Sequence, residues 1–253
     1  MYISVIVPFY YGNSHIKHIV ANIEENAKYL QLKHPDVKVE LIFVNDSPEL
    51  EMEIENQKKE SAESSIQIKA LQNDKNRGIH YSRVQGLKKA KGKYVVFLDQ
   101  DDELDRHFLR MQFEAIREND VVVCNGVHKY DTHEVQLYKN RYQLECTKQL
   151  KKYVTIRQQI ASPGQCLIRK EAIPQEWYRF IMQKNGADDY FLWILMLSNG
   201  RKFEVNGKVL YNHVITGENC SADLQKMDCS VDEMVELLWK VPYIDMRIKR
   251  KMR

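Results

Sequence analysis

The sequence YVVFLDQDD, residues Tyr94–Asp102, joins a run of five apolar residues to a cluster of carboxylates. A continuous apolar run of this length is typical of a buried strand in a parallel sheet. The carboxylates then lie at the carboxyl edge of the sheet, where open α/β folds bind their ligands. Like charges this close repel, and a bound Mg²⁺ or Mn²⁺ that carries phosphates would offset the repulsion. Taken alone, the stretch is explained equally well by an aspartate that caps a helix over Glu103–Asn119.

Strand and helix patterns alternate through the rest of the first half. Helices are predicted from Asn13 or Ser14 to shortly before Pro35, and over Gly78–Ala90. The segment Glu49–Glu63 is very polar, which indicates a solvated helix or a loop. Repeated β–α–β units at this spacing predict a parallel sheet with right-handed crossovers. The predicted strands are Ile3–Phe9, Val37–Val44, Ser65–Leu71 and Tyr94–Leu98.

The second half is less regular. A helix is predicted over Asp188–Asn199 with Gly200 as its stop, and another over Ala222–Lys240. No repeat or low-complexity linker divides the chain, so one globular unit is the simplest interpretation. The predicted strands are Asp120–Cys124, a hairpin over Val127–Tyr138, Gly164–Arg169, Lys202–Val205 and Lys208–Val214.

Composition restricts the class of protein. The chain has 253 residues, 43% hydrophobic residues and a net charge of +3, so it builds a core and does not indicate nucleic acid as a partner. Its five cysteines include no CxxC pair, which argues against a disulfide framework or a zinc site and favours a reducing compartment. We expect no signal peptide and no membrane span, since the N-terminus enters a strand and no apolar run approaches about 20 residues.

Three predicted strands end in polar or aromatic residues. In a parallel sheet these ends share one edge, so an aromatic loop and two acidic loops face a common crevice. Such a crevice suits a nucleotide whose phosphates are held through a metal. Neither a GxGxxG nor a GxxxxGK[ST] motif occurs, which disfavours dinucleotide binding and P-loop chemistry. The three strand ends are Pro8-Phe9-Tyr10, Asn45-Asp46-Ser47 and Asp99-Gln100-Asp101-Asp102.

These residues, taken in order, resemble family 2 glycosyltransferases with the GT-A fold. The resemblance is strong over residues 1–118 and weaker through Asp188-Asp189 and Tyr211-Asn212-His213. It implies an α/β fold of the GT-A type, in which a Rossmann-like, mostly parallel sheet is flanked by helices and followed by a mixed acceptor-binding half. The motifs that carry it are Ser4–Tyr10, Phe43–Ser47, Asn76-Arg77-Gly78 with Arg83 and Gly86, and Phe97–Asp102.

The resemblance also implies a UDP-sugar donor and transfer with inversion. Asp46 matches the residue that reads the uracil, Asp99 the acidic position near the ribose, and Asp101 the metal ligand, with Mn²⁺ or Mg²⁺ as cofactor. Arg83 suits the diphosphate, although a surface ion pair explains it equally well. Gln85 departs from the Asn common in the family. The donor-binding set is then Pro8, Phe9, Tyr10, Asp46, Asn76, Gly78, Arg83, Asp99 and Gln100.

The second half is expected to supply the base and the acceptor contacts. Asp189 matches the family's base, and Asp188 replaces its usual Glu; capping of the helix by either Asp is the alternative. His213 matches a histidine near the metal, with a structural histidine as the alternative. Two adjacent carboxylates can also raise a pKa toward neutral, as suits a base. The expected acceptor-binding residues are Gly164, Gln165 and Trp193, with Ser162-Pro163 in the same wall.

The C-terminal basic tail, Arg247–Arg253, has two interpretations: contact with anionic lipid, which would suit a lipid-linked acceptor, or a disordered solvated tail. We therefore expect a cytoplasmic, metal-dependent glycosyltransferase acting on a glycan or lipid-linked glycan for a surface polysaccharide, placed peripherally at the inner face of the membrane. A sugar-phosphate nucleotidyltransferase and a non-catalytic nucleotide-sugar or glycan-binding protein are the alternatives. The expected divisions are residues 1–118 for the nucleotide-sugar half, 119–221 for the acceptor half, and 222–253 for a C-terminal helix and tail.

Overall fold

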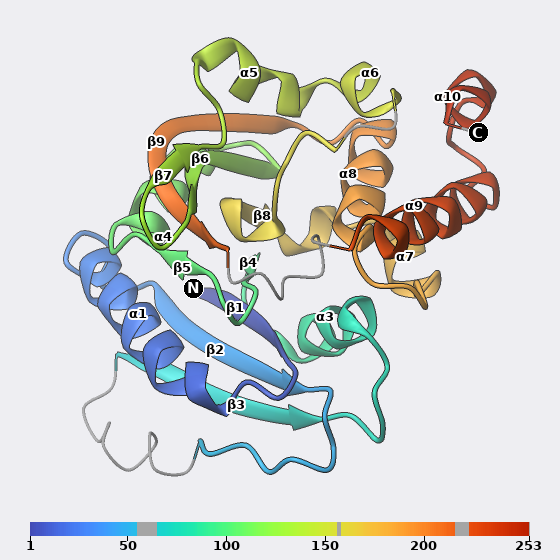
Figure 1. Cartoon of the computed structure of the whole chain (residues 1–253). Helices are drawn as coiled ribbons and strands as arrows, with labels where there is room; N and C mark the ends of the chain where they lie inside the picture. Colours follow the sequence, from blue (N-terminus) through green and yellow to red (C-terminus); the bar gives the residue numbers. More distant parts are fainter. Residues whose placement is uncertain (55–64, 156–157, 216–222, 253) are drawn as a thin grey trace.

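The structure is a computed structural model that describes residues 1–54, 65–155, 158–215 and 223–252. One sheet runs through these residues in the strand order β3-β2-β1-β4-β8-β6-β9-β5, with β7 paired to β6 (Figure 1). The first-half strands pair in parallel, as the repeated β–α–β pattern predicts. Of the polar segment Glu49–Glu63, residues 55–63 lie outside the described residues. The first-half strands are β1 (Tyr2–Phe9), β2 (Lys38–Asn45), β3 (Ile66–Gln72) and β4 (Tyr94–Phe97).

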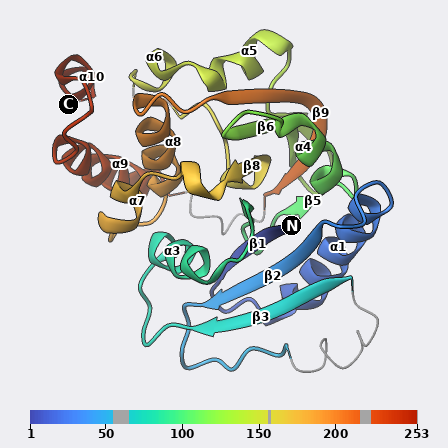
Figure 2. The ribbon, with the colours of Figure 1, turned by 180° about the vertical axis from the view of Figure 1, so that it is seen from behind.

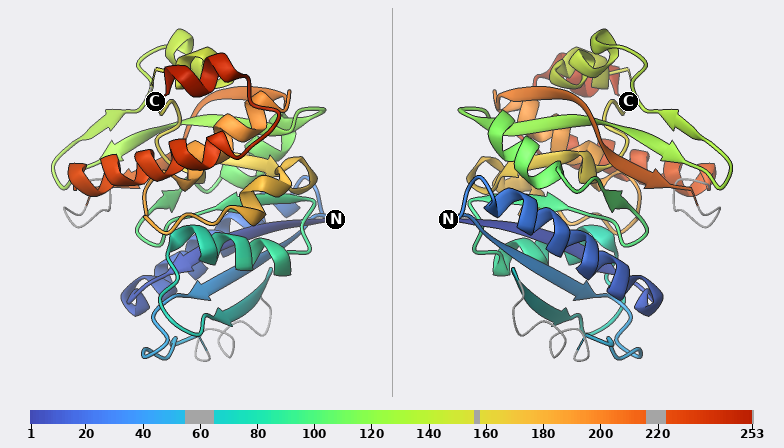
Figure 3. Two further views of the ribbon diagram at one scale, coloured as in Figure 1. Left: turned by 90° about the vertical axis from the view of Figure 1, so that its right-hand side faces the viewer. Right: turned by 90° about the vertical axis from the view of Figure 1, so that its left-hand side faces the viewer.

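Two helices cover opposite faces of these strands. Helix α1 (Asn13–Gln31) packs on one face and α3 (Ile79–Lys89) on the other, as the two views of Figure 3 show. Alternate residues of β1 therefore enter two separate apolar cores, since successive side chains of a strand point to opposite faces. Helix α3 lies very close to β1, because a Cβ at Gly86 would stand only 2.4 Å from the Ile6 side chain. The packing of α3 fixes the position of Arg83, which lies on this helix.

The second half extends the sheet with mixed pairing. Strand β8 pairs antiparallel with both β4 and β6, and the predicted hairpin is confirmed as β6 and β7. The prediction of two strands over Lys202–Val205 and Lys208–Val214 is wrong, because β9 is one strand that follows β6 across an irregularity in register. The second-half strands are β5 (Glu103–Leu104), β6 (Val121–Lys129), β7 (Glu134–Gln136), β8 (Cys166–Arg169) and β9 (Phe203–Val214).

Short helices surround this half, and one of them is almost wholly buried. Helix α8 (Asp188–Ser198) begins at the predicted Asp pair and ends before Gly200, whose positive φ of 71° suits glycine. Its buried apolar residues join the larger of the two cores. The remaining helices here are α4 (Phe108–Ile116), α5 (Arg141–Glu145), α6 (Leu150–Tyr153) and α7 (Gln175–Arg179).

The C-terminal segment is helical and packed. Helix α9 (Leu224–Trp239) is followed by α10 (Met246–Lys251), at the opposite end of the molecule from β3 (Figure 2). Lys249 is buried and its ammonium donates to the carbonyls of Val241 and Trp239, at 2.7 and 3.3 Å. A disordered tail is therefore the wrong interpretation for residues up to 252, and lipid contact stays a prediction. None of the helices in the described ranges has the length and apolar content needed to cross a bilayer.

Candidate active site

A cavity of about 1500 Å³ opens at the carboxyl edge of the first-half strands. It brings together the ends of β1, β2 and β4, as the sequence predicts, and adds the start of α8 and part of β9. Twelve of the sixteen predicted site residues line it. They are Pro8, Phe9, Tyr10, Asp46, Asn76, Arg83, Asp99, Gln100, Asp101, Asp188, Asp189 and His213.

Four predicted residues are elsewhere. Trp193 is fully buried in the core against Phe203, and a Cβ at Gly164 would stand 2.6 Å from the ring of Tyr211. The Gln165 amide turns inward, where it accepts from Ala161 N and donates to Cys124 O. Direct acceptor contact through Trp193, Gly164 and Gln165 is therefore the wrong prediction. Their neighbours Ser162 and Pro163 line the cavity instead, and Gly78 also lies off its wall.

Asp46 organises the loop that begins α3. Its carboxylate accepts from Asn73 Nδ2 and Gly78 N, both at 2.7 Å, and from Arg77 N at 2.8 Å. Gly78 has a φ of 86°, which an L side chain rarely adopts, so a glycine is required here. Gly78 thus acts through the backbone, and the uracil contact of Asp46 stays a prediction.

Gln100 ties the end of β4 to the end of β1. Its side-chain amide accepts from Tyr10 N at 2.9 Å and donates to Tyr10 O at 3.0 Å. Gly12 leaves room for this amide, since a Cβ there would stand 2.4 Å from Gln100 Oε1. The pairing holds the half-exposed ring of Tyr10 at the mouth of the cavity.

The three carboxylates of the acidic cluster point to different partners. Asp102 is buried and accepts from Tyr211 Oη, from His213 Nδ1 at 3.0 Å and from Val214 N at 3.1 Å. It faces β9 and does not cap a helix, because Glu103–Leu104 is the strand β5 and α4 begins only at Phe108. The predicted helix over Glu103–Asn119 is therefore wrong in its first turn.

Asp101 and His213 face the cavity with Asp99. Burial raises the pKa of Asp101, and the charge of Asp99 raises it further. Burial alone would lower the pKa of His213, but its hydrogen bond with Asp102 and the nearby carboxylates raise it. Among the described residues, no three His, Cys, Asp or Glu side chains converge closely enough to form a complete metal site. Carboxylate and imidazole groups are ligand types that divalent cations accept, and a metal role for Asp101 and His213 stays a prediction.

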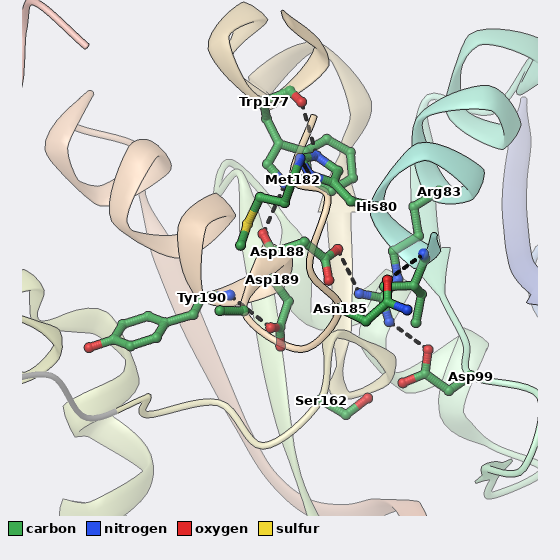
Figure 4. Close-up of polar contacts among 12 residues, drawn as sticks. His80, Arg83, Asp99, Ser162, Trp177, Met182, Asn185, Asp188, Asp189 and Tyr190 are labelled. Atoms are coloured by element: carbon green, nitrogen blue, oxygen red, sulfur yellow. Dashed lines mark hydrogen bonds and ion pairs between the residues drawn. The ribbon is translucent and has the colours of Figure 1, made fainter. Parts of the chain in front are cut away.

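Arg83 links the two halves of the cavity. It is 3% exposed, and its guanidinium donates to Asp188 Oδ2 at 2.8 Å and to Asp99 Oδ1 at 2.5 Å. Figure 4 shows Arg83 between these two carboxylates, with Asp189 beside them. Burial opposes its charge, but the surrounding aspartates hold the pKa of Arg83 above its usual value. The surface ion pair considered from the sequence is therefore wrong, and contact with a diphosphate stays a prediction.

The adjacent carboxylates of α8 have different environments. Asp188 faces Arg83, whereas Asp189 accepts from Gln158 Nε2 at 2.6 Å and from Tyr190 N at 2.8 Å. Burial, and then the charge of Asp188, raise the pKa of Asp189 to about 8. The N-cap of α8 is Ala187, so neither aspartate caps the helix by a side chain. A cavity carboxyl with a pKa near neutral is suited to general base chemistry.

Gln158 was not predicted as a site residue from the sequence. It lies in an irregular segment with no motif, and it contacts Asp189 across 31 positions of the chain. Only the fold brings it to the candidate base. Lys139 and Lys152, which line another part of the cavity, were missed for the same reason.

Comparison with known proteins agrees with this geometry. The model of the family described as "Glycosyl transferase family 2" matches residues 4–177. This chain belongs to that family. A Haemophilus influenzae protein described as an uncharacterized glycosyltransferase is 25% identical over 213 residues, which span 83% of this chain and 76% of that relative. Family membership makes this a glycosyltransferase and disfavours the nucleotidyltransferase alternative.

Solved structures support the GT-A fold. The structure of S. aureus TarS 1–349 in complex with UDP matches with a TM-score of 0.62 at 18% identity. The match covers all of this chain and 69% of the TarS chain. The same protein with UDP-GlcNAc reaches 0.65 at 18% identity, over all of this chain and 70% of that one. The Pyrobaculum calidifontis mannosyltransferase PcManGT, in complex with GDP-Man and Mn²⁺, reaches 0.61 at 13% identity, over 99% of this chain and 67% of that one. At these identities the likeness establishes the fold alone.

Proposed function

We propose that this glycosyltransferase moves one sugar from a UDP-sugar to a hydroxyl of a glycan or lipid-linked glycan, with inversion, in the synthesis of a surface polysaccharide. The observation that carries the proposal is the position of Asp189. Its carboxylate, with a pKa raised to about 8, lines the same cavity as the Asp99–Asp101 cluster on the predicted donor side. UDP as the donor nucleotide is supported by the TarS complexes, although one neighbour was solved with GDP-Man.

The geometry supports a single-step displacement. The acceptor hydroxyl loses its proton to Asp189 as its oxygen bonds to the anomeric carbon, and the bond from that carbon to the diphosphate oxygen breaks to release UDP. Attack from the face opposite the leaving group inverts the anomeric centre. Arg83 and Gln158 hold the carboxylates that border this space. A Mn²⁺ or Mg²⁺ ion, held by Asp101 and His213, would neutralise charge on the departing diphosphate.

The expected division of the chain fits this proposal. Residues 1–118 contribute the donor side of the cavity, and residues 119–221 contribute Asp189 and the opposite wall. Residues 222–253 would bring the protein to an anionic membrane surface through the exposed basic side chains of α10, Arg247, Arg250 and Lys251. A lipid-linked acceptor would then lie within reach.

The main experiment measures donor binding and turnover together. A thermal-shift panel of UDP-, GDP- and TDP-sugars with and without Mn²⁺ identifies the donor, because binding to the folded state raises its melting temperature. Release of UDP, followed by NMR of the anomeric proton of the product, tests transfer and inversion. Binding without UDP release on any acceptor or on water would favour the non-catalytic alternative.

The metal role of Asp101 gives a separate prediction. We expect Asp101→Asn to lose the extra thermal stabilisation that Mn²⁺ gives in the presence of UDP, because a neutral amide is a weak ligand for a hard cation. Asp131→Asn, at the exposed tip of the β6–β7 hairpin, is the control and should keep it. An unchanged manganese effect in Asp101→Asn would refute the metal assignment.

The raised pKa of Asp189 predicts the pH profile. Below a pH of about 8 the carboxyl is mostly protonated, so kcat/KM should fall up to tenfold for each pH unit of acidification. Stability should change with pH in the opposite direction to activity. Because folding raises the pKa of Asp189 from 3.8, the folded state is favoured in acid, and this contribution to the free energy of unfolding is lost as the pH rises toward about 8. Initial rates from pH 5 to 9 test the first point. A flat profile over that range would contradict the role of Asp189 as base.

A further inference from the structure

The cavity wall also includes second-half residues outside the predicted site. The cavity volume of about 1500 Å³ exceeds the roughly 300–1,000 Å³ of a typical small-molecule site. The second-half region of the cavity, which we call the basic arm, is walled by the segment from Lys139 to Thr155 and by Gln158 and Gln159. That segment includes α5 and α6, which lie at the opposite end of the molecule from β3 (Figure 1). The residues of the basic arm used below are Lys139, Gln143, Lys152 and Gln159.

The segment that forms the basic arm is strongly cationic. Residues 139–152 contain five basic side chains and a single acid, Glu145. Glu145 is bound to Arg141 at 3.3 Å and to Lys148 at 3.1 Å, and Lys148 also contacts Glu204. Within the part of the chain that the structure describes, no carboxylate lies within ion-pair distance of Lys139 or Lys152. Two lysines on the cavity wall are therefore left without a neutralising partner.

Local contacts fix the backbone at Lys139 and the side chain of Lys152. Asn140 caps α5 by accepting from Gln143 N at 3.0 Å, and Gln143 Oε1 accepts from Lys139 N at 2.7 Å. Lys152 stands 5.6 Å above the ring centre of Tyr142, whose side chain is 67% exposed. Tyr142 does not itself line the cavity, so this contact positions the ammonium group of Lys152 and is not part of the cavity wall.

The charge on the rest of the cavity wall has the opposite sign. The donor side carries Asp46, Asp99 and Asp101, and Arg83 there is already bound to two carboxylates. Under the proposed function, the diphosphate of a donor would lie with this acidic side, where Asp101 and His213 would hold a divalent cation. Lys139 and Lys152 are on the wall contributed by the second half. Lys152 donates to the neutral Tyr142 Oη at 3.4 Å, so both charges are available for a second anion that enters with the acceptor.

We propose that the basic arm binds an acceptor that carries an anionic group, a phosphate or a carboxylate, contacted by Lys139 and Lys152. This inference rests on the proposed function and specifies the chemical class of its acceptor. Neutral glycans lack the charge that these two ammonium groups complement. The anion also orients the acceptor, since the accepting hydroxyl must point back toward Asp189.

The test combines a double variant with matched probes. Lys139→Gln/Lys152→Gln is compared with Lys151→Gln, an exposed lysine of the same short helix that does not line the cavity. Saturation-transfer NMR measures binding of a hexose phosphate, a uronic-acid oligosaccharide and a neutral oligosaccharide of matched length. We expect wild type and Lys151→Gln to bind the phosphate or the uronate at least tenfold more tightly than the neutral probe, and the double variant to lose this preference. Comparison of the affinities for the phosphate and the uronate probes shows which anion is preferred.

Kinetics separate this inference from the proposed function. With an active anionic acceptor, the double variant should raise the acceptor KM at least tenfold and leave the donor KM and the rate of UDP-sugar hydrolysis unchanged. Raised salt should weaken acceptor binding to wild type but have little effect on the double variant. Equal binding of charged and neutral probes, or a rise in donor KM instead of acceptor KM, would overturn the proposal. Absence of UDP release from wild type under all conditions would instead count against the proposed function, while the NMR comparison would still decide the charge preference.

Discussion

Asp189→Asn is expected to lower kcat by about 10²- to 10⁴-fold, the range that a positioned general base contributes. The substitution keeps the size of the side chain and removes its ability to take a proton. Gln158 can rotate its amide to accept from the introduced amide group, so the local hydrogen bonds survive. Donor binding should persist, because the hydrogen bonds that hold Tyr10 and Asp46 do not involve Asp189.

The measurement is UDP release under single-turnover conditions, together with the UDP thermal shift. Asp228→Asn, an exposed carboxylate on α9, serves as the control and should retain full activity. A rate within threefold of wild type in Asp189→Asn would show that another group takes the proton. Loss of the UDP thermal shift as well would point to a structural role and not to a base.

Arg83→Met is expected to destabilise the fold by about 3–5 kcal/mol, the cost of removing one partner from a buried ion pair. The side chain of Asp188 is 2% exposed, so without the guanidinium its charge has neither water nor a counter-ion. Transfer should also fall at neutral pH, because Arg83 opposes the rise in the pKa of Asp189. The variant therefore affects both folding and the candidate base.

Urea unfolding followed by tryptophan fluorescence measures the first effect. Arg77→Met is the matched control, since Arg77 pairs with Asp74 on the surface, where such pairs contribute at most about 1 kcal/mol. Arg83→Met/Asp188→Asn should recover part of the lost stability by removing the unpaired charge. If Arg83→Met were as stable as Arg77→Met, the buried bridge would have no role in holding the two halves together.

Local sequence signals predicted the first half of the fold well. Strands β1 and β4 are largely apolar runs followed by polar or turn residues, and such runs identify buried parallel strands without knowledge of their partners. Strand β9 was predicted as two strands, which left out Asn206 and Gly207 between them. Its pairing with β6 carries the strand through, with a shift in register between Cys124 and Gly126. Long-range pairing set the extent of the strand there.

The candidate site was likewise predicted only in the part that depends on local sequence signals. The residues at the strand ends were found because topology alone brings them to one edge. The hydrogen-bond partners of those residues were not predicted. The bonds from Asp102 to His213 and from Arg83 to Asp188 join positions more than 100 residues apart. Trp193 shows the converse error: its place after the Asp pair suggested an acceptor contact, but a helix buried on all sides turns that indole into the core.

The strand order has a consequence for biosynthesis. Strand β5 directly follows β4 along the chain, yet β8, β6 and β9 lie between them in the sheet. During translation, β5 therefore cannot pair with β9 until residues 203–214 have emerged from the ribosome. Asp102 can form its hydrogen bonds with Tyr211 and His213 only after that point. The nascent chain consequently cannot complete this acidic pocket before residue 213 has been translated, so a product truncated before β9 would lack it.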